Sequence, residues 1–472
     1  MSAAASLRAA LDRAFTPRAV AVIGASAQPE KFGYKLVEHL VTGGFPGRIY
    51  PVNPRSAAIL GLQTYPALAK VPEPVDVAAL LVPAEATPAA VSECAAMGVG
   101  VAVIITSGFA ESSPAGARAQ AEMSAVARAA GMRIVGPNCE GLVNLQGGLV
   151  LSFSQMFLGQ RPGPISLVSQ SGAYCGIVSS RLSRAGVGTA KIVSSGNEGD
   201  LAAVDYLEYL GEDEDTRVIL LHVEGIREPR RFARVIGEVA ARKPVVVNKT
   251  GRTETGRRQA LSHTGAVAGN DRALASLLRQ RGVVRTRHMD DFVDAGLALA
   301  SAGPLGGNRV AILTVAGGLA VELADLLGEA GFAIPPLTAA TRRVLDQHIP
   351  GYGTTANPVD FTGMMITRPA AVGECLAAVL DDPTIDAVAF VLTAVGDPEF
   401  ARQVHARMSA SPKPVVICWT AGPALAGAAL EYFTQHRIPI FESTPRLVSA
   451  LGALRAYWGF RLGPEFRAEG AR

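Results

Sequence analysis

Short runs of apolar residues alternate along the chain with longer stretches whose apolar positions follow a helical period. In the first third, we expect strands in four such runs. They lie at Val20–Gly24, Val77–Pro83, Val99–Ser107 and Arg133–Gly136. Continuous apolar strands that alternate with helices are typical of a parallel sheet covered by helices on both faces. We therefore predict one doubly wound α/β domain over residues 1–140.

The same alternation recurs in two further parts of the chain. There, too, apolar runs that we expect to form strands precede helix-like stretches. They lie at Ile165–Ser169, Ala190–Ser194, Arg217–Val223 and Pro244–Asn248, and then at Val310–Val315, Ala387–Leu392 and Pro414–Trp419. Between the two parts, Ala302–Asn308 is rich in glycine and proline and is typical of a linker. We predict a second domain over residues 145–300 and a third over 307–472.

The composition agrees with this organisation. The chain has 472 residues, of which 49% are hydrophobic and 18% are charged, so it is long enough for about three domains with separate cores. Its net charge of +3 does not favour a protein that binds nucleic acid or a membrane surface. A modest basic patch for a phosphate-rich ligand is compatible with this charge.

The cysteines and the apolar stretches bear on the cellular compartment. The five cysteines are far apart and form no CxxC pair, which disfavours disulfides and a metal site and indicates a reducing cytoplasm. The N-terminal stretch lacks the apolar core of a signal peptide. The longest uncharged stretch, Gly141–Gln160, contains several amide and hydroxyl side chains. We therefore expect a cytoplasmic protein without a membrane span.

The first candidate motif is VIGASAQPEKFG, residues 22–33, which joins an expected strand to an expected helix. A glycine-rich turn at this place exposes backbone N–H groups to an anion, and the helix dipole adds to the attraction. Ser26 stands where a GxGxxG motif has its second glycine, so a nicotinamide dinucleotide is a weak interpretation. An ordinary strand-to-helix turn explains the motif equally well when it is taken alone.

Other turns strengthen the binding hypothesis because each follows an expected strand. They are Pro51–Arg55, Val82–Ala84, Thr106–Phe109 and Gly136–Cys139. In open α/β sheets, ligands bind outside the carboxyl ends of the strands. We therefore expect these turns to surround one phosphate-bearing ligand.

The second motif is Ser169-Gln170-Ser171-Gly172, which lies between an expected strand and an expected helix. Small residues leave N–H groups open at a helix start, and serine hydroxyls can donate to a phosphoryl group. A nucleophilic serine is the competing interpretation, but the sequence is not GxSxG. A simple serine cap of the helix is a third interpretation.

The third motif places His263 among small residues in Ala260–Ala266, shortly after Lys249–Arg252. We expect this segment to be a loop. Neutral imidazole attacks phosphorus readily, and histidine can form covalent intermediates. Glu224 ends an apolar strand and is a candidate to hold the imidazole in the right tautomer. The alternatives are an ordinary surface histidine and a salt bridge between Glu224 and a nearby arginine such as Arg227. His222, within a strand, is a weaker candidate.

Together these motifs resemble those of the NDP-forming acyl-CoA synthetases, relatives of the succinyl-CoA synthetase α subunit. The resemblance runs through nearly all 472 residues, from VIGAS through GPNCEG, VSQSGA, SSGNEGD and SHTGA to IPIFESTPRLVSALGAL. SHTGA after KTGR is the most specific part. The resemblance implies a Rossmann-like CoA-binding domain followed by two flavodoxin-like doubly wound domains.

The resemblance also implies roles for individual residues. His263 matches the phosphorylated histidine, Glu224 the acidic residue that supports it, and Ser169, Gln170, Ser171 and Gly172 the phosphate-binding helix start. The region that holds CoA matches Gly24, Ala25, Ser26, Ala27, Gln28, Asn53, Arg55, Val82, Pro83, Ser107 and Asn138.

The chain departs from single-chain members because no segment after Ser301 corresponds to their ATP-grasp module. The resemblance then implies that ATP or ADP, with Mg²⁺, binds to a separate ATP-grasp β-type subunit. The substrates would be CoA and a small carboxylic acid, and the assembly a hetero-oligomer or a homodimer. A smaller departure is Val315 before Ala316-Gly317-Gly318, where relatives often have asparagine.

The resemblance implies an NDP-forming acid–CoA ligase, and two other functions remain open beside it. The first is a non-catalytic CoA-binding sensor or scaffold that lacks the ATP-grasp partner, against which the intact SHTGA and SQSG motifs argue. The second is a nicotinamide-dependent oxidoreductase, against which the missing GxGxxG argues.

Overall fold

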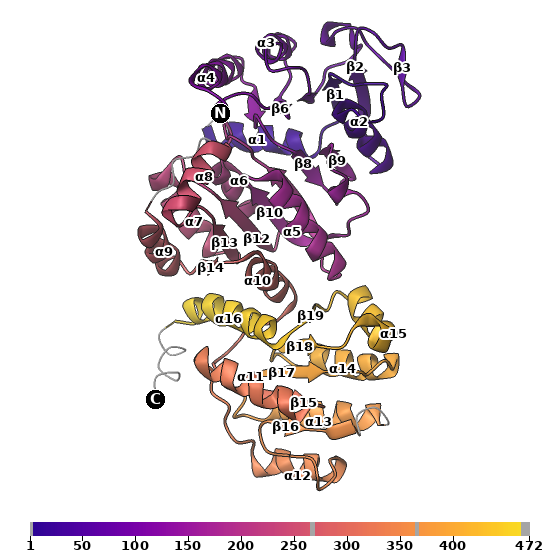
Figure 1. Cartoon of the computed structure of the whole chain (residues 1–472), viewed down its shortest axis with the longest axis vertical. Helices are drawn as coiled ribbons and strands as arrows, with labels where there is room; N and C mark the ends of the chain where they lie inside the picture. The colour runs from indigo at the N-terminus through magenta and orange to yellow at the C-terminus, as the bar shows by residue number, and fades with distance from the viewer. Residues whose placement is uncertain (1–2, 265–269, 364–367, 464–472) are drawn as a thin grey trace. The chain divides into compact units, whose positions relative to one another are not determined.

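The computed structural model describes residues 3–264, 270–363 and 368–463, with the backbone alone for residues 3–6, 260–264 and 423 (Figure 1). The chain folds into two compact units. The first comprises Met1–Ser183 and Gly188–Arg281, and the second comprises Arg184–Val187 and Gly282–Arg472.

The first unit opens with a parallel sheet in the order β2-β1-β5-β6-β7. Its elements are α1 (Ala3–Phe15), β1 (Ala19–Ile23), α2 (Phe32–Thr42), β2 (Arg48–Val52), β3 (Ala58–Ile59), β4 (Leu62–Gln63), β5 (Val77–Leu80), α3 (Thr87–Ala96), β6 (Val101–Ile104), α4 (Pro114–Ala129) and β7 (Arg133–Val135). Every residue of β1, β5 and β6 is buried, as expected for strands covered on both faces. Ile23 pairs with Val52 and Leu80, so these strands end at one edge of the sheet.

A second sheet of the first unit contains the run β13-β12-β10-β11-β8-β9. Its elements are β8 (Gly141–Asn144), β9 (Leu149–Ser152), β10 (Pro162–Ser169), α5 (Gly172–Arg184), β11 (Thr189–Ser194), α6 (Ala203–Glu212), β12 (Val218–Val223), α7 (Pro229–Ala240), β13 (Val245–Lys249), α8 (Glu254–Thr264) and α9 (Asp271–Gln280). β10, β11, β12 and β13 are parallel, whereas β8 is antiparallel to β11 and to β9. The sequence patterns did not predict the β8–β9 hairpin.

The second unit holds a parallel sheet in the order β16-β15-β17-β18-β19. Its elements are β14 (Val284–Thr286), α10 (Met289–Ser301), β15 (Val310–Thr314), α11 (Gly317–Glu329), α12 (Ala339–His348), β16 (Val359–Asp360), α13 (Pro369–Asp381), β17 (Ala387–Leu392), α14 (Pro398–Ala410), β18 (Val415–Trp419), α15 (Pro423–Gln435), β19 (Ile440–Phe441) and α16 (Thr444–Arg461). One group of helices, α10, α11 and α16, packs together, and α12 to α15 form another. An ion pair of 2.6 Å between the buried Asp294 and the partly exposed Arg446 joins α10 to α16.

The predicted α/β class, with parallel sheets in successive parts of the chain, is confirmed. The domain limits at residues 140, 145, 300 and 307 stay predictions.

Candidate functional site

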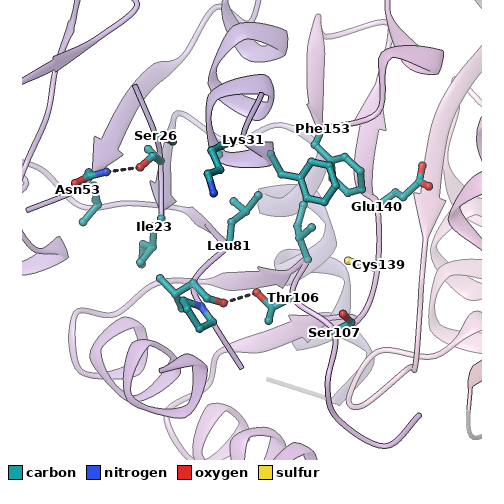
Figure 2. Close-up of a pocket in the computed structure, with 18 of the residues that line it drawn as sticks. Ile23, Ser26, Lys31, Asn53, Leu81, Thr106, Ser107, Cys139, Glu140 and Phe153 are labelled. Carbon is teal, nitrogen blue, oxygen red and sulfur yellow. Dashed lines mark hydrogen bonds between the residues drawn. The ribbon is translucent and has the colours of Figure 1, made fainter. Parts of the chain in front are cut away.

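A cavity of about 1160 Å³ lies in the first unit, where β1, β2, β5 and β6 end and α5 begins (Figure 2). Most of the residues expected to bind CoA or phosphate line it. They are Gly24, Ala25, Ser26, Gln28, Asn53, Arg55, Val82, Pro83, Ser107, Asn138, Gln170, Ser171 and Gly172. The structure therefore brings two motifs that are far apart in the sequence to one space. Ala27 and Ser169 are not in the lining, since Ala27 is exposed and Ser169 is buried.

The turn after β1 is tight, and glycine at position 24 makes it possible. Gly24 has φ of +91°, and a Cβ there would lie 2.8 Å from the carbonyl carbon and oxygen of Leu81. A Cβ on Gly33, in the first turn of α2, would collide with the Gly24 carbonyl oxygen. No side chain caps the start of α2, and its residues Lys31, Phe32 and Gly33 line the cavity. Such a helix start attracts an anion.

Two polar residues of the lining hold the loops in place. The Asn53 side chain donates to the Ala25 carbonyl at 2.6 Å and accepts from the Arg55 N–H at 2.7 Å. The Thr106 hydroxyl donates to the Val82 carbonyl at 2.7 Å, as Figure 2 shows. These hydrogen bonds fix the shape of the cavity wall. Asn53 therefore contributes to the site by holding the turns after β1 and β2 together.

The charges of the lining are few. Lys31 and Arg55 carry positive charge, and Glu93 and Glu140 carry carboxyl groups. Cys139 also lines the cavity, and burial raises the pKa of its thiol to about 12. The thiol therefore stays protonated at neutral pH and is a poor nucleophile.

The side chain of Gln170 joins the helix start of α5 to the end of β12. Its Oε1 accepts from the backbone N–H groups of Glu224 at 2.5 Å and of Gly225 at 3.1 Å. Its Nε2 donates to the Gly225 carbonyl at 3.0 Å. The buried Lys249 donates to the Glu224 carbonyl at 2.7 Å. Glu224 is thus held next to the predicted phosphate-binding turn.

Behind this turn lies a buried histidine whose contacts the sequence patterns did not reveal. His222 is 2% exposed, and its Nδ1 lies 2.9 Å from the Ser169 hydroxyl. Its Nε2 lies 3.2 Å from the Thr250 hydroxyl, and its ring stacks on Tyr174. Because Ser169 pairs with His222 in the sheet, strand register was the signal that could have placed them together.

His263 lies in α8, so the expected loop is wrong for the backbone of residues 260–264, which is helical. Arginine, glutamine, alanine and leucine in this segment favour a helix, and that preference prevailed over the small residues around His263. α8 follows β13 at the sheet edge where β10 and β12 also end. The side chain of His263 and residues 265–269 lie outside the described part of the chain.

A second buried carboxyl, that of Glu198, lies close to Asn197, which bonds the Asn138 side chain at 3.2 Å. Glu198 is 3% exposed, and its Oε1 accepts from the Ser195 hydroxyl at 2.9 Å and from the Ala203 N–H at 3.1 Å. Burial raises the pKa of Glu198 from 4.5 to about 7, and the hydrogen bonds from Gln170 and Ser195 offset the burial only in part.

This raised pKa predicts that the chain loses stability as the pH rises. Between pH 4.5 and about 7, folded Glu198 holds a proton that the unfolded chain has released. The free energy of unfolding should therefore fall through this window, by an amount on the order of 2–3 kcal/mol. Glu198→Gln keeps the acceptor oxygen but cannot ionise. In urea unfolding, the variant should match the wild type near about pH 5 and exceed it near about pH 8. An equal pH dependence in both proteins would contradict this assignment.

Among the residues that the structure describes, none of the helices is long and apolar enough to cross a membrane.

Comparison with known proteins places three family matches along the chain. Residues 18–144 match the CoA binding domain, residues 162–299 the succinyl-CoA ligase like flavodoxin domain, and residues 310–461 the ligase-CoA domain.

Individual relatives span almost the whole chain. The chain is 35% identical to the acetate–CoA ligase [ADP-forming] I subunit alpha of Pyrococcus furiosus, over 94% of this chain and 97% of that one. It is 36% identical to the acetate–CoA ligase [ADP-forming] I of Archaeoglobus fulgidus, over 95% of this chain but 64% of the relative. A solved structure, the dinucleotide forming acetyl-coenzyme A synthetase 1 of Ca. Korarchaeum cryptofilum in complex with phosphate and ADP, superimposes with a TM-score of 0.87. It is 32% identical and covers 98% of this chain and 99% of its own. The chain belongs to the family of ADP-forming acyl-CoA synthetases.

Proposed function

We propose that this chain is the CoA-binding and phosphoryl-carrying subunit of an ADP-forming acid–CoA ligase. One observation carries the proposal: a single cavity is lined both by the Gly24 turn and by the start of α5 at Gly172. A reaction between CoA and a phosphorylated acid needs two such anion-binding turns around one space.

The end of the cavity near β1 suits CoA. Lys31 and Arg55 can pair with the phosphate groups of CoA, and the open start of α2 adds N–H groups and a favourable dipole. A volume of about 1160 Å³ leaves room for an extended ligand of this size. The thiol would then reach toward Cys139 and Gly172.

The other end suits a phosphoryl group. The N–H groups at the start of α5 and the Ser171 hydroxyl can donate to phosphoryl oxygens, where negative charge is greatest during transfer. Glu224 lies beside this turn and is our candidate to orient the imidazole of His263. Ser169 stabilises the turn, since its hydroxyl donates to the Ser171 carbonyl at 2.7 Å.

The reaction then proceeds through His263. Its imidazole nitrogen attacks the terminal phosphorus of ATP, and the bond between that phosphorus and the ADP oxygen breaks. The carboxylate oxygen of the acid next attacks the phosphohistidine, the P–N bond breaks and an acyl phosphate forms. The CoA sulfur attacks the acyl carbon, inorganic phosphate leaves and the thiol proton passes to solvent. Each step is reversible.

We assign the nucleotide and its Mg²⁺ to a separate ATP-grasp subunit. The name of the Pyrococcus furiosus relative, a subunit alpha, supports this assignment. The free and buried state of all five cysteines supports the cytoplasm as the compartment.

Reconstitution tests the proposal. The chain and its ATP-grasp partner should together convert ATP, CoA and a carboxylic acid to ADP, phosphate and acyl-CoA in equal amounts. The chain alone should bind CoA in calorimetry but form no acyl-CoA. Binding of CoA without turnover of any acid in the complex would instead support a CoA sensor. Turnover by the chain alone would contradict the assignment of the nucleotide to a partner.

A further inference from the structure

Glu140 lines the cavity beside the start of α5. It directly follows Cys139 and precedes β8, and both Cys139 and Glu140 line the cavity (Figure 2). A Cβ on Gly172 would lie 2.8 Å from Glu140 Oε1, so the carboxyl group covers the first turn of α5. Phe153 lines the cavity nearby and stacks on Phe32, with ring centroids 4.2 Å apart. The acyl group of the proposed intermediate must therefore pass close to this carboxyl.

The carboxyl group of Glu140 is poorly satisfied within the described residues. Its Oε2 is buried and has no hydrogen-bond partner there. None of the ion pairs found among those residues includes Glu140. Burial raises the pKa of Glu140, and Ser154 offsets the effect only in part. The dipole of α5 favours a negative charge at this place but does not supply the missing donor.

A buried carboxyl oxygen without a donor is costly, and a ligand that brings a donor removes the cost. The last torsion of a glutamate side chain is broad and roughly two-fold, so either oxygen can face the cavity. A hydroxyl or an ammonium group on the acyl chain would supply the donor. A second carboxylate on the acid would instead meet a like charge.

We propose that Glu140 determines which acid this subunit accepts. It selects carboxylic acids whose acyl chain bears a hydrogen-bond donor, a hydroxyl or an ammonium group, and it discriminates against dicarboxylic acids. This inference rests on the proposed function, because it concerns the acid used in that same reaction.

The test uses the complex of the chain with its ATP-grasp partner and acids of increasing length. At each length, the set contains one acid that ends in a methyl, one in a hydroxyl, one in an ammonium and one in a carboxylate group. We expect the wild type to have a kcat/KM about tenfold to a hundredfold higher for the best donor-bearing acid than for its methyl counterpart. Glu140→Leu should remove or reverse this ratio.

Glu140→Gln separates the two donors. The amide keeps an acceptor oxygen for a hydroxyl but loses the charge that attracts an ammonium group, so only the ammonium preference should fall. Glu93→Gln is the matched control, because Glu93 lines the same cavity beside the turns expected to hold CoA. It should leave the ratios between acids unchanged.

Several outcomes would overturn the inference. If the wild type has a higher kcat/KM for acids that end in a methyl or a carboxylate group, the inference is wrong whatever the variants show. An unchanged ratio in Glu140→Leu would show that the carboxyl merely caps α5. Phosphorylation of the chain by ATP is measured in parallel without any acid. If the chain is phosphorylated but shows no preference among acids, only the role of Glu140 fails and the proposed function stands.

Discussion

Replacement of His263 by alanine is expected to lower acyl-CoA formation by the complex by roughly a thousandfold or more. The reason is that no other group takes the phosphoryl group from ATP in the proposed reaction, and loss of a covalent nucleophile removes the whole route. CoA binding should persist, since the turns proposed to hold CoA lie in other segments of the chain, among them Gly24–Gln28 and Asn53–Arg55. Steady-state assays of the complex, with calorimetry of CoA binding to the variant, measure both quantities.

The exposed His436 provides the matched control, because its ring contacts Tyr432 of α15 and His405 of α14, both in the second unit. His436→Ala should retain the activity of the wild type. Activity of His263→Ala within about tenfold of the wild type would refute the role of His263.

The second large effect is expected from Gly24→Ala. The substitution places a Cβ 2.8 Å from the Leu81 backbone at a residue with φ of +91°, so the turn after β1 must shift. We expect a loss of about 3 kcal/mol in the free energy of unfolding and a drop of at least about tenfold in CoA affinity. Chemical unfolding and calorimetry with CoA measure these two losses.

Gly44 allows the cost of a positive φ to be separated from the cost of a steric clash with the added Cβ. It has φ of +76°, but a Cβ there would meet no atom within 4 Å. Gly44→Ala should cost only about 1 kcal/mol and leave CoA affinity unchanged. Equal losses in both variants would mean that the approach of Gly24 to Leu81 does not shape the CoA site.

The central strands of the sheets could be predicted because a strand that is buried on both faces is a continuous run of apolar residues. β1 and β5 are continuous apolar runs, and each ends at a turn that the sequence already marked. The β8–β9 hairpin could not be predicted in the same way. Its short strands lie in a stretch with scattered amides and hydroxyls, where neither an apolar run nor a clear alternation stands out.

The same distinction applies to the cavity. The glycine and serine turns were predicted because they stand directly after strands. Glu140 and Phe153 were missed, since their places in the wall depend on how the hairpin packs against α2. Ser169 and Ala27 are near the predicted site but do not line it, because a motif marks a turn without showing which side chains face the ligand.

His222 shows a further limit of sequence patterns. Within a predicted strand, His222 resembles an ordinary core residue. Only the register of the sheet shows that it lies next to Ser169. His263 shows the converse, since its small neighbours indicated a loop whereas the backbone forms the end of α8.

The most direct test of the central claim is a two-stage transfer with ATP labelled in its terminal phosphate. The complex is incubated with labelled ATP and Mg²⁺, freed of nucleotide, and then given CoA and an acid that it accepts. We predict an acid-labile label on His263 of this chain after the first stage. In the second stage, the label should leave as inorganic phosphate, with one acyl-CoA formed for each phosphate released. Absence of label on the chain, or a label that CoA and the acid together cannot discharge, would contradict the account.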